Sequence, residues 1–227
     1  MKVADSELLA LVTGGTRGIG LGITKHLESN GWKVQATDRS DLDLEDRISV
    51  LQWTVSNLSL NPYLLVCNAG INIPKKIDSQ TEEEFLRINQ VNYLSNILLI
   101  KSVIPQMLKN GEGRVIFISS TYAQKSKEGR SAYSASKAAM EAFIRTCAIE
   151  YASHNILFNS IAPGFIETDL TLANNDEMQI REITNRIPIG RLGKPSEIAE
   201  LVKFLGSPFN TYITGQTINV DGGFSIT

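Results

Sequence analysis

Cysteine and histidine are scarce in this chain, and the few that it has stand apart from one another. Cys67 and Cys147 lie in separate apolar segments without C-x-x-C spacing, so they support neither a zinc site nor a disulfide framework. His26 and His154 lack partners at metal-ligand spacing. We therefore expect no metal site, and the two isolated cysteines fit the reducing environment of the cytoplasm.

Long hydrophobic runs and an excess of one charge are also missing. No apolar stretch approaches the roughly 18 to 20 residues that a membrane span needs, and the first residues lack the regions of a secretory signal. The chain has 22 basic and 24 acidic residues, a formal net charge of −2, and no dense basic run. These features argue against nucleic acid or a membrane as a partner and favour a small molecule.

Apolar strand-like segments alternate with helical segments along the chain. We expect strands at residues 7–12, 32–38, 62–70, 113–120, 156–164 and 216–223, and helices at 21–32, 81–107, 131–152 and 195–207. This order predicts an α/β fold with one doubly wound, mostly parallel sheet and helices on both faces. With 227 residues, of which 42% are hydrophobic, we expect a single Rossmann domain over residues 1–227. Such sheets bind ligands at the carboxyl ends of their strands.

The first expected strand ends in a glycine-rich turn, TGGTRGIG. Gly14, Gly18 and Gly20 have the spacing G-x-x-x-G-x-G, and Asp38 ends the next strand 18 residues after Gly20. Glycines here let the chain turn tightly and bring main-chain N–H groups close to a pyrophosphate. A plain tight turn is the alternative. The strand before the turn, the helix after it and the acid at the next strand end favour a dinucleotide site.

The choice between NAD and NADP stays open at this point, with a lean to NAD. Asp38 is placed to accept hydrogen bonds from the ribose hydroxyls and to repel a 2′-phosphate. Arg17 and Arg39 argue for NADP, because arginine binds phosphate in a bidentate fork. Either arginine can equally be a solvated surface charge.

Tyr133 and Lys137 lie four residues apart in YSASK, which puts them on one face of a helix. A free tyrosine has a pKa of about 10, and a nearby ammonium group lowers it, which eases proton exchange near neutral pH. A surface pair without a chemical task is the alternative. Ser120 at a strand end, Asn92 in a helix and the NAG motif at residues 68–70 favour one shared cleft instead.

Seven features, in order and with matching spacing, make the chain resemble the short-chain dehydrogenase/reductase family over essentially its whole length. They are TGGTRGIG, Asp38, CNAG, VNY, ISS, YSASK and APGFIETD. The resemblance implies an NAD(P)-dependent oxidoreductase that moves a hydride between nicotinamide and a ketone or secondary alcohol. It also implies a catalytic group of four side chains: Asn92, Ser120, Tyr133 and Lys137.

The resemblance assigns each of these four side chains a task. Tyr133 exchanges a proton with the substrate oxygen, and Ser120 hydrogen-bonds the same oxygen. Lys137 holds the nicotinamide ribose and lowers the tyrosine pKa, and Asn92 anchors a water that leads protons to solvent. The implied cofactor-binding residues are Gly14, Thr16, Arg17, Gly18, Ile19, Gly20, Asp38, Arg39, Asp43, Leu44, Asn68, Ala69, Gly70, Tyr133, Lys137, Pro163, Gly164, Ile166 and Thr168.

The substrate is less closely defined than the reaction. The C-terminal third is similar to bacterial 3-oxoacyl-acyl-carrier-protein reductases, which reduce a β-ketoacyl thioester. Two features depart from those enzymes: Asp38 is atypical of an NADPH-dependent fatty-acid enzyme, and the stretch from Asp38 to Asp43 is too short for the usual helix after the second strand. A dehydrogenase of sugars, polyols or hydroxy acids is therefore the alternative.

Two readings from other classes fit less well. A non-catalytic NAD(P)-binding regulator would have no chemical need for all four side chains of the catalytic group. A P-loop hydrolase is excluded because TGGTRGIG lacks the Gly-Lys-Ser/Thr ending that binds phosphate and magnesium.

A polar segment at residues 165–194 interrupts the alternation of strands and helices. Its central part, Thr171 to Arg191, follows a turn expected to contact the cofactor, where a mobile substrate lid would lie. We expect this segment to set specificity. The resemblance also implies a homo-oligomer, a dimer or tetramer, assembled through the helix that carries Tyr133 and through the C-terminal helix and strand.

Overall fold

One parallel sheet forms the centre of the computed structural model, which describes residues 8–173 and 175–227. The described strands lie in the order β2-β1-β3-β4-β5-β6, and every neighbouring pair is parallel. They are β1 (Leu9–Thr13), β2 (Lys33–Thr37), β3 (Leu64–Cys67), β4 (Gly113–Ile118), β5 (Ile156–Pro163) and β6 (Thr217–Val220). The expected doubly wound α/β fold is confirmed, although Glu7, at the start of the first expected strand, lies outside the described residues.

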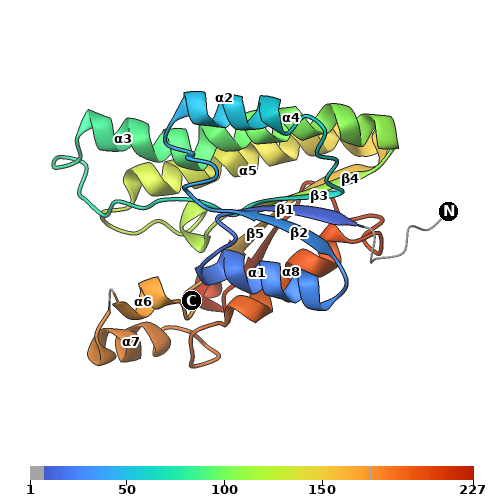
Figure 1. Cartoon of the computed structure of the whole chain (residues 1–227). Coiled ribbons are helices and arrows are strands. Elements are labelled where there is room, and N and C mark those ends of the chain that lie inside the picture. The colour runs from blue at the N-terminus through green and yellow to red at the C-terminus, as the bar shows by residue number, and fades with distance from the viewer. Residues whose placement is uncertain (1–7, 174) are drawn as a thin grey trace.

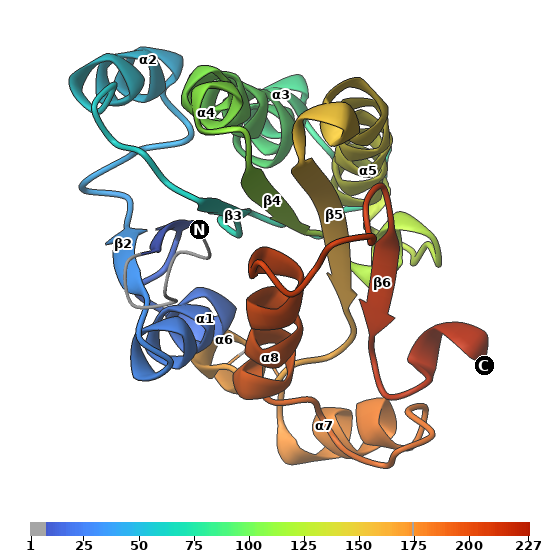
Figure 2. The same cartoon turned by 90° about the vertical axis from the view of Figure 1, so that its right-hand side faces the viewer.

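Helices cover both faces of the sheet (Figure 1). One face carries α2 (Arg47–Ser56), α3 (Glu82–Asn89), α4 (Ser95–Asn110) and α5 (Ser131–Tyr151). The other face carries α1 (Gly18–Ser29) and α8 (Pro195–Gly206). Two short helices, α6 (Asp169–Ala173) and α7 (Glu177–Thr184), project beyond the sheet near the C-terminus, as Figure 2 shows. None of the described helices is long and apolar enough to cross a membrane.

Strands β3, β4 and β5 are buried along their whole length because helices cover them on both sides. Successive side chains of a strand point to opposite faces. Leu65 and Cys67 of β3 therefore join the core under α4 and α5, whereas Leu64 and Val66 join the core under α1 and α8. This packing fixes the positions of the carboxyl ends of the strands, where the site is built.

The chain passes from β1 to β2 on one side and then crosses to β3 on the other side of β1. The carboxyl ends of β1 and β3, at Thr13 and Cys67, therefore form the topological switch point of the sheet. Ligands of open α/β sheets bind in the crevice at this point.

Three segments differ from the sequence-based expectations. Helix α2 was not expected, and the Asp46 carboxylate caps it by accepting a hydrogen bond from the Ile48 N–H (2.8 Å). A π-helical turn at Gln90–Leu94 divides the long helix expected at residues 81–107. Residues 165–194 contain α6 and α7 in place of irregular chain. The segment between β2 and α2 holds only turns, but a helix does follow the second strand, so the expectation that the usual helix would be missing there is wrong.

Candidate active site

The glycine turn after β1 has no room for larger side chains. Gly14 and Gly18 have φ angles of 62° and 54°, in the left-handed region that favours glycine. A Cβ on Gly20 would lie 2.1 Å from the oxygen of Gly14 and 2.5 Å from Nδ2 of Asn68. Helix α1 begins at Gly18, and the Arg17 side chain does not cap it. Its first N–H groups can therefore bind an anion, as a dinucleotide pyrophosphate requires.

Asn68 fastens the loop after β3 to this turn. Its Nδ2 donates hydrogen bonds to the main-chain oxygens of Thr13 (2.9 Å) and Gly14 (3.1 Å). The Thr13 Oγ1 accepts hydrogen bonds from the N–H groups of Asn68 (3.0 Å) and Ala69 (3.1 Å). The turn and the NAG loop therefore form one hydrogen-bonded unit at the switch point.

The segment after β5 also lies against the glycine turn. A Cβ on Gly18 would stand 3.6 Å from Cγ2 of Thr168, and Ile166 forms an isolated bridge with Gly193. β5 itself ends at Pro163. Four further residues expected to contact the cofactor lie along the same edge of the sheet: Thr16 in the turn, Ile19 in the first turn of α1, Leu44 after β2, and Gly164 after β5.

The end of β2 is acidic, and its arginine is already paired. Asp38 Oδ1 accepts hydrogen bonds from the Ser40 N–H (2.7 Å) and Oγ (2.6 Å), which lower the pKa of this carboxyl below its ordinary value. Arg39 forms ion pairs with Asp43 (3.1 Å) and Glu45 (3.1 Å). Both carboxylates occupy the Arg39 guanidinium. Arg39 is therefore turned to these carboxylates and not to a 2′-phosphate, which the sequence alone had left possible.

Tyr133 and Lys137 lie on α5, as expected, with Lys137 Nζ 5.8 Å from the centre of the tyrosine ring. Lys137 is only 3% exposed, and its Nζ donates a hydrogen bond to the main-chain oxygen of Ile118 (2.7 Å) at the end of β4. Ser120, two residues after that strand end, is also buried. The structure therefore brings the serine, the tyrosine and the lysine together at the carboxyl end of β4.

The pKa of Tyr133 differs from the expectation. Burial raises it above the ordinary value, while a hydrogen bond with Ser120 and the charge of Arg130 lower it. The Lys137 ammonium group, 5.8 Å from the centre of the Tyr133 ring, is hydrogen-bonded to the oxygen of Ile118. Arg130, which the sequence did not single out, is a further cation that acts on the phenol.

Asn92 lies in the π-helical turn and is fully buried. Its Nδ2 donates hydrogen bonds to the main-chain oxygen of Ile71 (2.9 Å) and to the Ser136 Oγ (3.0 Å), and its Oδ1 accepts one from the Ile71 N–H (2.8 Å). Both N–H donors of the amide are thus used within the protein. Asn92 instead connects the loop after β3 to α5, with Gly70 close beside its Oδ1.

Burial lowers the pKa of Lys137 from its ordinary value to about 8, and the charge of Glu141 raises it against that effect. Cys67 also faces Lys137, but burial raises the pKa of this thiol to about 12, so it stays neutral. Glu141 is 4% exposed and accepts a 2.5 Å hydrogen bond from the buried Ser119 Oγ. Glu141 was not expected as a site residue, although its position four residues after Lys137, on the same helix face, was a signal in the sequence.

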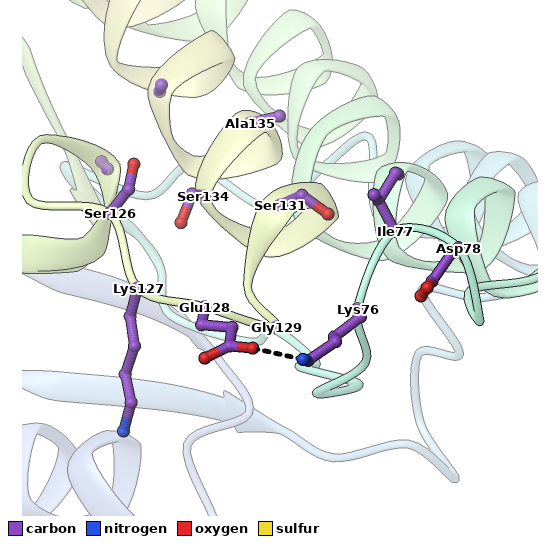
Figure 3. Close-up of a pocket in the computed structure, with 12 residues that line it drawn as sticks. Lys76, Ile77, Asp78, Ser126, Lys127, Glu128, Gly129, Ser131, Ser134 and Ala135 are labelled. Carbon is purple, nitrogen blue, oxygen red and sulfur yellow. Dashed lines mark ion pairs between the residues drawn. The ribbon is translucent and has the colours of Figure 1, made fainter.

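A separate cavity of about 680 Å³ lies beside the N-terminal part of α5 (Figure 3). Lys76 and Glu128 form an ion pair of 2.7 Å at its rim, and Ser131, Ser134 and Ala135 of α5 face it. None of the four expected catalytic side chains lines this cavity. It is therefore distinct from the site at the strand ends.

Three features together define a nicotinamide-dependent oxidoreductase. They are the doubly wound sheet, the glycine turn at its switch point, and the serine, tyrosine and lysine at the next strand end. Comparison with known proteins places this chain within that class. A family profile described as enoyl-(acyl carrier protein) reductase matches residues 61–225. The chain belongs to the short-chain dehydrogenase/reductase family.

Curated relatives match over nearly the whole chain. The 3-oxoacyl-[acyl-carrier-protein] reductase of Vibrio cholerae is 37% identical over 95% of this chain and 96% of its own length. A tropinone reductase homolog of Arabidopsis thaliana is 34% identical over 96% of this chain and 92% of its own length.

Solved structures agree with this assignment. A Beutenbergia cavernae protein described as an NAD(P) dependent gluconate 5-dehydrogenase, with bound NADP, has a TM-score of 0.92 and 29% identity, with 97% of each chain covered. The 3-ketoacyl-(acyl-carrier-protein) reductase of Brucella melitensis, complexed with NADH, has a TM-score of 0.88 and 30% identity, with 98% of this chain and 100% of that chain covered. The chain is thus an NAD(P)-dependent oxidoreductase that acts on a ketone or secondary alcohol.

We expect Glu141→Gln to move the alkaline limb of the pH–rate profile for ketone reduction to lower pH. The amide still accepts a hydrogen bond from Ser119, but it no longer favours the charged form of Lys137, so the rate above pH 8 should fall about threefold or more. Steady-state rates from pH 6 to 9 measure the effect. Glu150→Gln, at the exposed end of α5, is the control. An unchanged profile would show that the Glu141 charge does not act on Lys137.

Proposed function

We propose that Tyr133 exchanges the proton of the substrate oxygen and that Ser120 donates a hydrogen bond to the same oxygen. The observation that carries this proposal is that the buried Ser120 lies close enough to the Tyr133 hydroxyl, at the carboxyl end of β4, to lower its pKa. An oxygen held by both groups would receive a proton from one and charge stabilisation from the other. The bound nicotinamide would supply or accept the hydride at the substrate carbon.

Lys137 and Asn92 then have supporting tasks. Lys137 is buried beside Gly70 of the NAG loop, so we propose that it binds the nicotinamide ribose there. Its positive charge would also favour the phenolate of Tyr133 once the ammonium group leaves the oxygen of Ile118. Asn92 positions the loop after β3 against α5 through Ile71 and Ser136. From this position Asn92 would also anchor the water that the family resemblance implies.

For the cofactor we propose NAD over NADP. Asp38 stands at the end of β2, where it would meet the adenosine ribose, and Asp41, Asp43 and Glu45 add negative charge close by. Arg39 is held by two of these carboxylates. A 2′-phosphate would therefore meet repulsion that Arg17 alone has to offset.

The substrate proposal keeps two classes open. The similarity to 3-oxoacyl-acyl-carrier-protein reductases supports a 3-oxoacyl thioester, and the gluconate 5-dehydrogenase-like neighbour supports a sugar, polyol or hydroxy acid. We also propose that residues 165–194 act as the lid that selects between them. Ile187 and Leu192 of this segment pack with Phe224 in a small core of their own, separate from the two cores of the sheet.

We further propose a homo-oligomer, a dimer or tetramer, in the cytoplasm. Large apolar side chains are exposed around the C-terminal end of α8 and the edge strand β6: Phe204 is 46% exposed, Phe209 73% and Tyr212 95%. Exposed apolar groups of this size commonly mark an interface. The cavity of Figure 3 opens on the α5 side of the molecule, where a second contact would cover it. The free, buried Cys67 and Cys147 suit a reducing compartment.

NADH should bind at least about tenfold more tightly than NADPH, and Asp38→Ala should reduce that difference. The substitution removes both a ribose acceptor and the charge that repels a 2′-phosphate. Titration of nicotinamide fluorescence gives both dissociation constants, with Asp78→Asn in a distant loop as the control. Equal binding of the two cofactors, or tighter binding of NADPH, would contradict the proposal.

Tyr133→Phe should lower kcat for ketone reduction by about 10²- to 10⁴-fold while the NADH dissociation constant changes less than about twofold. The variant loses only the hydroxyl group that exchanges the proton. Oxidation of NADH at 340 nm with β-ketoacyl thioesters, keto sugars and small ketones measures the loss and identifies the substrate class. Tyr212→Phe, at a 95% exposed tyrosine, should have no effect. Undiminished turnover by Tyr133→Phe would refute the assigned role.

Light scattering should give a multiple of the 25.0 kDa chain mass. Phe209→Glu should shift the protein toward smaller species, because it places a charge within the exposed apolar group near β6. A monomer at micromolar concentration in the unsubstituted protein would rule out the proposed oligomer.

A further inference from the structure

A run of alternating acidic and apolar residues, DLDLE, follows the turn after β2. Its two apolar members, Leu42 and Leu44, are 3% and 5% exposed and belong to the core under α4 and α5. The Ser95 Oγ, at the start of α4, donates a hydrogen bond to the main-chain oxygen of Leu44 (2.7 Å). These contacts fix the run against the body of the protein, and with it the positions of the acids Asp43 and Glu45.

Glu45 binds Arg39 through both of its carboxylate oxygens. The Arg39 Nη1 lies 3.3 Å from Oε1 and its Nη2 lies 3.1 Å from Oε2, which is a bidentate contact. The Arg39 Nε donates a third hydrogen bond, to Asp43 Oδ2 (3.1 Å). All three nitrogen atoms of the guanidinium group are therefore engaged by acids.

A second arginine holds Glu45 from the side of α3. The Arg87 Nη2 donates a hydrogen bond to Glu45 Oε1 (2.6 Å), the oxygen that also accepts from Arg39. An isolated surface ion pair contributes little, but a bidentate pair within a network of charges keeps its geometry better. The Glu45 side chain is only 22% exposed. Glu45 is thus a fixed acceptor for Arg39 and not a freely moving surface acid.

Arg39 directly follows Asp38, the residue proposed to meet the adenosine ribose. A 2′-phosphate on that ribose would need a nearby guanidinium group, which binds phosphate in a bidentate fork. Arg39 has the right chemistry, but Asp43 and Glu45 already use its donors. Asp43 has a second task in the loop, because its Oδ1 accepts a hydrogen bond from the Glu45 N–H (2.9 Å). Glu45 is therefore the acid whose charge can be removed without loss of that turn.

We propose that Glu45 is a specificity-determining residue for the cofactor: it keeps Arg39 engaged and so denies a 2′-phosphate its guanidinium partner. The inference rests on the proposed function, because it takes the adenosine ribose to lie at Asp38. Discrimination against NADP then has two parts, since Asp38 repels the phosphate directly and Glu45 acts through Arg39. The chain thus holds an arginine suited to NADP that an acid six positions later keeps out of use.

Glu45→Gln tests the proposal, because it keeps the size of the side chain and removes its charge. NADPH should then bind about 3- to 10-fold more tightly, while the NADH dissociation constant should change less than about twofold. Titration of nicotinamide fluorescence gives both constants. Calorimetry with adenosine 2′,5′-bisphosphate and with AMP measures the adenosine end alone, where only the bisphosphate should gain affinity.

A double-mutant cycle separates the release of Arg39 from the simple loss of one negative charge. Arg39→Gln should cost at least about threefold more NADPH affinity in the Glu45→Gln protein than in the unsubstituted protein. Arg39→Lys in the Glu45→Gln protein should keep part of the gain, because lysine supplies a charge without the fork. Loss of charge alone would make the cost of Arg39→Gln equal in the two backgrounds.

Glu82→Gln is the matched control, and thermal melting checks that each variant is folded. Glu82 is an exposed acid in the first turn of α3 and forms no ion pair with the described residues. Its substitution removes the same charge from the chain without releasing Arg39. Both cofactors should therefore bind this variant as they bind the unsubstituted protein.

Three outcomes would overturn the role of Glu45. They are unchanged NADPH binding by Glu45→Gln, an equal cost of Arg39→Gln in both backgrounds, and the same gain in Glu82→Gln. The preference for NAD fails separately if the unsubstituted protein binds NADPH at least as tightly as NADH, and the cycle then still decides whether Glu45 restrains Arg39. If neither the dinucleotides nor the adenosine nucleotides bind any of the variants, the nucleotide site is refuted, and the role of Glu45 with it.

Discussion

The hydrogen bonds between Asn68 and the end of β1 are the constraint on which the rest of the site depends. They join the NAG loop after β3 to the glycine turn after β1, on the two strands that flank the switch point. The same amide lies so close to Gly20 that any side chain there would displace it. The glycine at position 20 and the amide of Asn68 therefore depend on each other. A change in either would displace the nucleotide turn. It would also displace the loop that holds Gly70 next to Lys137.

A second set of buried polar contacts places α5 against the sheet. Lys137 is bound to the end of β4, Glu141 to Ser119, and Asn92 to Ser136. A buried polar group costs free energy unless it is paired, so these contacts favour one position of the helix over others with equal apolar burial. The apolar core supplies most of the stability, whereas the polar contacts decide where the tyrosine hydroxyl stands. Stability and alignment thus come from different residues of the same helix.

The sequence predicted the parts of the fold that local pattern controls. The buried strands, the glycine turn and α5 each have a strong apolar or helical pattern, and all three were placed correctly. Helix α2 was missed because its apolar pattern is weak, with Ile48 and Val55 more than 60% exposed. The π-helical turn at Asn92 was not predicted for another reason, because it depends on tertiary contacts with the loop after β3. Pairing between distant residues, such as Ser119 with Glu141, was likewise invisible before the strands and helices were assembled.

Charge divides the site into two ends, and this division bears on how ligands orient in it. The β2 end carries Asp38 and the carboxylates that neutralise Arg39, whereas Arg130, directly before α5, forms no ion pair with the described residues. The chain as a whole has a net charge of only −2, so this polarity arises from placement and not from composition. Tyr133 lies nearer the cationic end, where the charge of Arg130 opposes the burial that would otherwise keep its phenol protonated. Arg130 is therefore suited to ease proton exchange at the Tyr133 hydroxyl.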